Sequence, residues 1–139
     1  METFPYRSSK VEEVSLGSQV ERDFCILLIN SSLFYLYWST YSNLRDFPLS
    51  LLEKFPFPSL DTLNSRSAEI SDLKNRVSDC LRGNFITHNA QGNSGRVGEF
   101  RTAQCRSEID EIDDLIGTMY GLDATEIAFV KNYDIHIRR

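Results

Sequence analysis

Two histidines, His88 and His136, are the first residues to consider for catalysis. They lie far apart in the chain, and neither has a Ser or Cys nearby in a nucleophile motif. A second set of groups with chemical potential is acidic: Glu108, Asp110, Glu111, Asp113 and Asp114. Carboxylates spaced this way on one helix usually form a solvated face, which also suits the positive end of the helix dipole. We therefore expect no catalytic residue and no metal site.

Two polar segments, one from Tyr41 to Arg45 and the other from Asn93 to Arg101, carry side chains that could contact nucleic acid. Asn and Gln can read adenine through two hydrogen bonds, and Arg can read guanine in the same way. The candidate DNA-binding residues in these segments are Tyr41, Asn43, Arg45, Asn93, Arg96 and Arg101. The alternatives are structural: an exposed, disordered turn around Asn93, and an Arg45 that pairs with Asp46 or caps a helix.

The Gly-rich run GNSGRVGE is not a phosphate-binding loop, because it lacks the spacings of both common glycine motifs. The chain has 15 Lys and Arg against 20 Asp and Glu, for a formal charge of −5. Such a balance disfavours independent DNA binding. The acidic charge balance is a weaker argument against a module that binds DNA together with a basic partner.

The three cysteines, Cys25, Cys80 and Cys105, are odd in number and match no zinc-site spacing. We expect free thiols in a reducing cytoplasm, with Cys25 and Cys80 acting as small hydrophobes in helical apolar stripes. No apolar run is long enough for a membrane span, and the N-terminus lacks the apolar core of a signal peptide. The sequence thus predicts a cytoplasmic protein with no membrane association and no cofactor.

These candidates must be positioned by a mainly α fold with one small β-hairpin, in a single compact α+β domain over residues 18–139. Residues 1–17 form an N-terminal extension that we expect to be partly disordered. Apolar spacing and capping residues predict helices at 18–29, 32–41, 48–54, 62–82, 107–120 and 124–133. Ser107 is the expected N-cap of the fifth helix, and Gly121 its stop. The hairpin lies near 84–101, with 85–87 pairing with 97–100 around a flexible tip.

The densest aromatic stretch, INSSLFYLYWSTYSNLRDFPLSLLEKFPFP, spans Ile29–Pro58 and holds the only tryptophan and three of the four prolines. Apolar residues cover nearly the full circumference of its helix at 32–41, so we expect that helix to be buried on most sides. Leu33, Phe34 and Trp38 are expected to hold the domain together. The polar segment from Tyr41 to Arg45 is the edge where a DNA contact would lie.

This stretch resembles a segment near the C-terminus of adenine-specific DNA methyltransferases of type IIG and related restriction–modification systems, which have TaqI-like C-terminal specificity regions. The matching positions are Asn30, Ser31, Leu33, Phe34, Tyr35, Tyr37, Trp38, Ser42, Arg45, Phe55, Pro56 and Pro58. A second block is similar to the C-terminal end of the same family. Its residues, in order, are Phe100, Ile109, Asp110, Glu111, Ile112, Asp113, Tyr120, Gly121, Glu126, Tyr133, Asp134 and Ile135. Together the blocks cover about residues 20–139.

The resemblance implies DNA specificity without turnover. The Asn-Pro-Pro-Tyr/Phe motif that holds the flipped adenine in this family is missing, as are the S-adenosylmethionine loop and the nuclease motif. The leading hypothesis is therefore a non-enzymatic target-recognition fragment, either a split subunit or a truncated remnant, which binds DNA together with a methyltransferase or restriction subunit. The alternative is a protein–protein interaction or structural module, such as a homodimer, that does not bind DNA.

Overall fold

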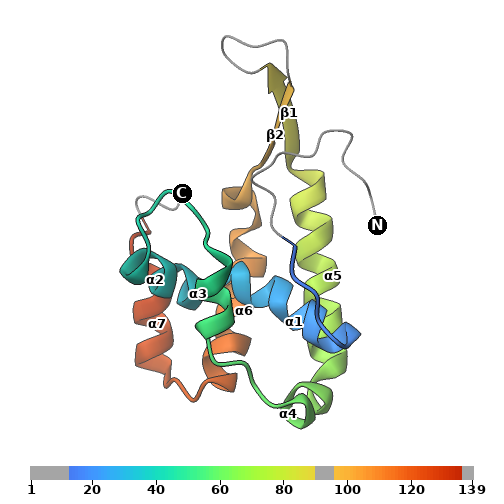
Figure 1. Cartoon of the computed structure of the whole chain (residues 1–139), viewed down its shortest axis with the longest axis vertical. Coiled ribbons are helices and arrows are strands. Elements are labelled where there is room, and N and C mark those ends of the chain that lie inside the picture. The colour runs from blue at the N-terminus through green and yellow to red at the C-terminus, as the bar shows by residue number, and fades with distance from the viewer. Residues whose placement is uncertain (1–12, 90–95, 136–139) are drawn as a thin grey trace.

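A computed structural model of the chain describes residues 13–89 and 96–135. Its elements, labelled in Figure 1, are α1 (Gln19–Ile29), α2 (Ser32–Tyr41), α3 (Leu49–Lys54), α4 (Leu60–Ser65), α5 (Ser67–Gly83), β1 (Phe85–Asn89), β2 (Arg96–Phe100), a 3₁₀ turn η1 (Thr102–Cys105), α6 (Arg106–Met119) and α7 (Ala124–Asn132). The predicted fold class, mainly α with a small hairpin, is confirmed. Within the described ranges, no helix combines the length and apolar character that crossing a bilayer requires.

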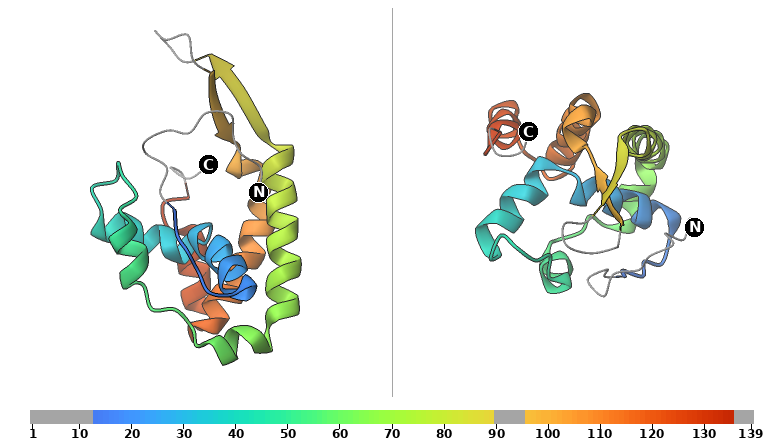
Figure 2. Two further views of the ribbon diagram at one scale, coloured as in Figure 1. Left: turned by 45° about the vertical axis from the view of Figure 1, so that its right-hand side comes forward. Right: turned by 90° about the horizontal axis from the view of Figure 1, so that it is seen from above.

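The helices α5, α6 and α7 stand side by side, and α1 and α2 lie across one face of this layer (Figures 1 and 2). Phe24, Leu27 and Leu28 of α1 are fully buried where it meets α5 and α6. They join a core to which α5 and α6 each contribute one apolar face: Ile70, Leu73 and Val77 from α5, and Ile112, Leu115 and Ile116 from α6. The 3.6-residue periodicity of the sequence therefore corresponds to real buried faces.

Short polar residues begin several of these helices, as the sequence predicts. The Ser18 and Ser31 side chains accept hydrogen bonds from the amides of Glu21 and Phe34, at 3.3 and 3.1 Å. Asp123 and Glu126 form the full capping box of α7, in which each side chain accepts a 2.8 Å bond from the other residue's amide. These caps satisfy amides that the helical ladder leaves without partners.

The aromatic stretch packs through Phe55, whose ring lies 5.5 Å from the ring centroid of Phe34 and 5.5 Å from that of Tyr120. The expectation for the 32–41 helix is only partly right. Phe34 is buried, but Leu33 and Trp38 are half-buried against the core. The reason is that aromatic side chains with polar tips need partners at the rim. Trp38 Nε1, for example, donates to the Asp46 carbonyl at 3.0 Å.

One predicted helix, 62–82, is wrong as a single element, because Arg66 breaks it into α4 and α5. Ser59 accepts from the Thr62 amide and starts α4 directly after Pro58. The polar run from Asn64 to Ser67 offers the backbone competing hydrogen bonds, and Arg66 leaves the helical conformation with φ −119° and ψ 19°.

The expected N-cap of the next helix is also wrong. The helix begins at Arg106 rather than after Ser107, because η1 feeds directly into it. Its end is as predicted: Gly121 has φ +77°, and its amide donates to the Thr118 carbonyl at 3.1 Å. A left-handed residue at this position favours glycine, which has no Cβ to clash.

The prediction of three free thiols is wrong for two of them. Cys80 of α5 and Cys105 at the end of η1 form a disulfide, and only Cys25 is a free cysteine among the described residues. Burial raises the pKa of the Cys25 thiol. The disulfide joins residues 25 apart in the sequence and encloses the whole hairpin. In the chain-entropy model, closing a loop of this size stabilises the fold by about 3 kcal/mol.

A buried carboxylate joins α2 to α6. Asp113, only 3% exposed, accepts a 2.7 Å bond from the Ser32 amide and a 2.5 Å bond from the Ser32 hydroxyl. The Ser32 amide is one of the donors that the start of α2 leaves without a helical partner. Asp113 therefore caps α2 from another helix, 81 residues away in sequence.

We predict that Asp113→Ala lowers the free energy of unfolding by about 2–4 kcal/mol, because it leaves buried donors of Ser32 without their acceptor. The matched control is Asp114→Ala, which removes the neighbouring carboxylate. Asp114 is exposed and pairs with Lys131 at 2.7 Å, so its loss should cost less than about 1 kcal/mol. Urea unfolding followed by circular dichroism measures both values, and equal losses for the two variants would contradict this role of Asp113.

Candidate nucleic-acid interface

The hairpin projects beyond the helical body in both Figure 1 and Figure 2. Its strands pair antiparallel, with Phe85 opposite Phe100 and Asn89 opposite Arg96. The predicted pairing of 85–87 with 97–100 is thus correct and extends two residues further along β1. Two strands of this length form a ribbon that can enter the major groove of DNA.

Gly98 is required in this ribbon by close packing. The Phe85 ring lies over Gly98, and a Cβ added at that glycine would be 2.4 Å from the ring. An aromatic side chain that covers a cross-strand glycine stabilises the pairing that sets the register of the hairpin.

The base of the hairpin is fixed to the helical body by three links. The Arg101 amide donates to the Asn84 carbonyl at 3.1 Å, which extends the pairing by one residue. The Asn84 side-chain amide donates to the Cys80 carbonyl at 2.8 Å. The Cys80–Cys105 disulfide then connects the helix before the hairpin to the turn after it. The hairpin therefore leaves the body from a defined position.

Two arginines stand at this base. Arg82 lies in the last turn of α5, Arg101 directly follows β2, and both side chains are exposed. No carboxylate in the described ranges lies within ion-pair distance of either one. Exposed guanidinium groups without acidic partners are suited to phosphate contacts, which supply most of the affinity of proteins for DNA.

Three other arginines of the described residues are paired with carboxylates. Arg76 of α5 forms two hydrogen bonds with the Glu111 carboxylate of α6, at 2.9 and 2.6 Å, and also pairs with Asp72 at 3.1 Å. The hydrogen bonds from Arg76 lower the pKa of Glu111, and those with Glu111 and Asp72 raise the pKa of Arg76. Arg66, at the break between α4 and α5, pairs with Glu69 at 3.7 Å, and Arg106 pairs with Asp110 of its own helix at 3.2 Å. Arg82 and Arg101 at the hairpin base thus differ from these three arginines of the helical body.

The second predicted segment, from Tyr41 to Arg45, lies at the end of α2 and in the loop 42–48, which hydrogen bonds hold in place. Asn43 Oδ1 accepts from the amides of Arg45 and Asp46, at 3.0 and 3.1 Å, while Ser42 Oγ accepts from Leu44 at 3.1 Å. These bonds hold Leu44 in the left-handed region at φ 62°, with its side chain 58% exposed. Asn43 therefore shapes the loop. Arg45 forms no ion pair with any described residue, so the structural alternative in which it pairs with Asp46 is wrong.

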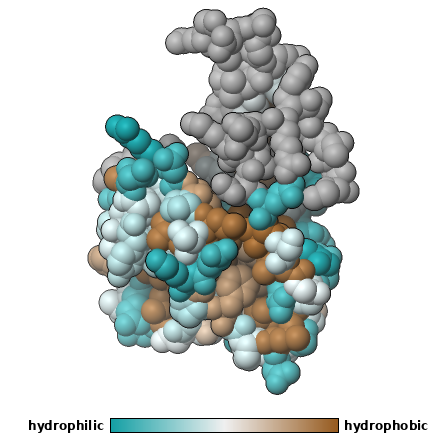
Figure 3. Space-filling model, in the orientation of Figure 1, coloured by the Kyte–Doolittle hydropathy of each residue, from teal (hydrophilic) through white to brown (hydrophobic). Residues whose placement is uncertain are grey.

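The loop borders a groove of about 880 Å³ between α1 and α3. Its lining is mostly apolar, with Val14, Leu16, Ile26, Ile29, Phe47 and Leu52 among the residues that form it. Arg22 and Arg45 stand at the same groove. Figure 3 shows hydrophobic surface across the middle of this face, bordered by hydrophilic side chains.

The predicted residues fall into two groups. Tyr41, Asn43 and Arg45 lie together at the end of α2, and Arg96 and Arg101 belong to the hairpin. Asn93 and His136 lie outside the described residues, as do residues 1–12 of the predicted N-terminal extension. Sequence reasoning missed Arg82. Its position in the last turn of a helix directly before a hairpin was the available signal, but a cation there also suits the helix dipole.

Searches of protein-family models, curated proteins and solved structures find no match to this chain. The resemblance to restriction–modification methyltransferases therefore stays a prediction from its residue pattern.

Proposed function

We propose that this chain is a non-catalytic DNA target-recognition fragment of a restriction–modification methyltransferase. It is a split subunit or a truncated remnant of such an enzyme, and it acts in the cytoplasm together with a methyltransferase or restriction subunit. The observation that carries the proposal is the projecting hairpin, whose base bears two exposed arginines that have no acidic partner among the described residues. The order of the two family-like blocks in the sequence supports it.

The two surfaces, the hairpin and the apolar groove with the loop 42–48, would have different functions. A two-stranded ribbon can lie in the major groove with its arginines near the phosphates, and Arg96 on β2 has the side-chain type that reads guanine. The net charge of −5 limits the affinity of the isolated chain. The apolar groove and the loop 42–48 would then contact the subunit that supplies the remaining basic surface.

We predict that the protein binds random-sequence duplex DNA in a salt-dependent way and that Arg82→Gln/Arg101→Gln weakens this binding. The slope of log K against log salt is negative, and each lost phosphate contact lowers its magnitude by about 0.9, so the magnitude should fall by about two in the double variant. The measurement is fluorescence anisotropy over a salt series, for the chain alone and with any methyltransferase subunit that a neighbouring gene encodes.

The matched control is Arg76→Gln/Arg66→Gln, which removes the same charge from arginines that are already paired with carboxylates. It should leave the slope nearly unchanged. Equal losses in the two double variants would mean that only net charge matters. Absence of binding both alone and with the methyltransferase would contradict the proposal.

The alternative function, a protein–protein interaction module, is favoured by one observation. Tyr41, Leu44 and Phe47, at the end of α2 and in the loop after it, are 70%, 58% and 41% exposed. Leu44 is also held in a backbone conformation that costs about 1 kcal/mol for a residue with a Cβ. An exposed apolar residue kept in a strained position is a reasonable candidate for a partner contact.

If the chain is a homodimer through this surface, we predict that Leu44→Asn shifts it to monomer. Asn tolerates the left-handed conformation and removes the apolar contact, so the fold should not be destabilised. Sedimentation equilibrium at several concentrations measures the change, with Leu60→Asn as a control at an exposed leucine on α4. A strict monomer that binds DNA would eliminate the homodimer.

A further inference from the structure

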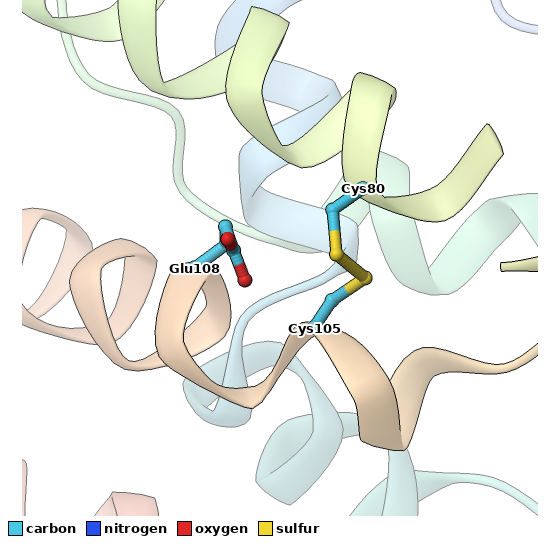
Figure 4. A group of neighbouring side chains, drawn as sticks. All are labelled: Cys80, Cys105 and Glu108. Carbon is cyan, nitrogen blue, oxygen red and sulfur yellow. A yellow bond between two sulfur atoms is a disulfide. The ribbon is translucent and has the colours of Figure 1, made fainter. Parts of the chain in front are cut away.

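Three groups that can bind a metal ion meet at the base of the hairpin. The sulfur atoms of Cys80 and Cys105 and a carboxylate oxygen of Glu108 all lie within 4.8 Å of one another. Figure 4 shows the disulfide between α5 and the start of α6, with the Glu108 side chain beside it. Because Cys105 and Glu108 are three residues apart at a helix start, they share one side of the helix.

The surroundings of the sulfur atoms support a site rather than a chance cluster. The Asn84 side-chain nitrogen lies 3.6 Å from Cys80 Sγ and 3.9 Å from Cys105 Sγ. The same nitrogen is held by its 2.8 Å bond to the Cys80 carbonyl. An amide donor fixed near both sulfurs would stabilise thiolates, as outer-shell partners of metal ligands commonly do.

The burial of the three groups leaves one side open. Cys105 is fully buried, whereas Cys80 and Glu108 are half-buried. A metal ion held by these three groups would therefore face solvent on one side, where water can complete a tetrahedral shell.

We infer that the reduced protein binds one soft divalent cation, Zn²⁺ in particular, through Cys80, Cys105 and Glu108. A dithiol reductant breaks the S–S bond by supplying two electrons and two protons, and itself becomes a cyclic disulfide. The two resulting thiols release their protons to solvent as two metal–sulfur bonds form. The Glu108 carboxylate supplies the third protein ligand.

Two thiolates about 2.3 Å from one zinc ion stand farther apart than two bonded sulfurs, and rotation of the half-buried Cys80 side chain can provide this separation. The ion would then join α5 to α6 where the disulfide does so in the oxidised protein. The base of the hairpin would be held in both oxidation states. The inference does not depend on DNA binding.

The test compares one sequence in two oxidation states. The oxidised chain, unfolded without reductant, should show one titratable thiol, that of Cys25, and the reduced chain should show three. Each form is then titrated with Cd²⁺, followed by the thiolate-to-cadmium charge-transfer absorption, and Zn²⁺ is added in competition. The reduced protein should bind one ion, and the oxidised protein should give no band.

Glu108→Gln should weaken Cd²⁺ binding by the reduced protein at least about tenfold, since even the loss of an outer-shell partner costs this much. Asp79→Asn, which removes an exposed carboxylate next to Cys80 but outside the cluster, should leave the affinity unchanged. Cys80→Ser should abolish the charge-transfer band. Because the Glu108→Gln comparison and the redox comparison keep both cysteines, they remain decisive even if Cys80→Ser does not fold.

Several results would overturn the inference. A reduced protein without the band, or an oxidised protein that binds equally well, would remove the thiolate site. If the chain showed three titratable thiols before reduction, the disulfide would be absent and the metal site would not depend on the oxidation state. An unchanged affinity in Glu108→Gln, or an equal loss in Asp79→Asn, would show that Glu108 is not a ligand.

Discussion

The arrangement of this chain depends on one interaction, the hydrogen bonds between the buried Asp113 carboxylate of α6 and Ser32 of α2. A carboxylate removed from water is costly unless hydrogen bonds replace its hydration. Here the amide and hydroxyl of Ser32 donate these hydrogen bonds, at the positive end of α2. Because the donors belong to the first turn of α2, the bond fixes where that helix starts on α6. The loop at the other end of α2 is positioned as a consequence.

The same helix, α6, also positions the hairpin. Its N-terminus follows directly from η1, whose last residue, Cys105, is bonded to α5. The helix α5 in turn meets α1 through a buried apolar face and through Lys74, whose amino group lies 3.5 Å from the buried carboxylate of Asp23. Both candidate surfaces, the loop 42–48 and the hairpin, are therefore anchored to one helix by specific bonds and not only by apolar packing.

Local signals in the sequence were sufficient for the hairpin and for most of the helices, but not for the break at Arg66. Alternation, capping residues and glycine stops depend on neighbours within a few positions, so α1, α2, α6 and α7 lie within a residue or two of their predicted bounds. Features that depend on distant residues were missed. The disulfide joins positions 25 apart, and no spacing rule pairs them. Asp113 could have been recognised, because it falls between Ile109 and Ile116 on the apolar face of its helix.

The candidate DNA surface was predictable in outline only. Composition marked both polar segments, but a polar side chain can equally shape a loop, and Asn43 does so. Charge counts along the sequence also cannot separate Arg76, which is paired, from Arg101, which has no acidic partner among the described residues. The most direct test of a DNA-binding hairpin is amide chemical-shift mapping of the isotope-labelled protein during titration with duplex DNA. The largest changes should fall on Phe85–Asn89 and Arg96–Arg101, whereas changes confined to α7 and the loop 42–48 would contradict it.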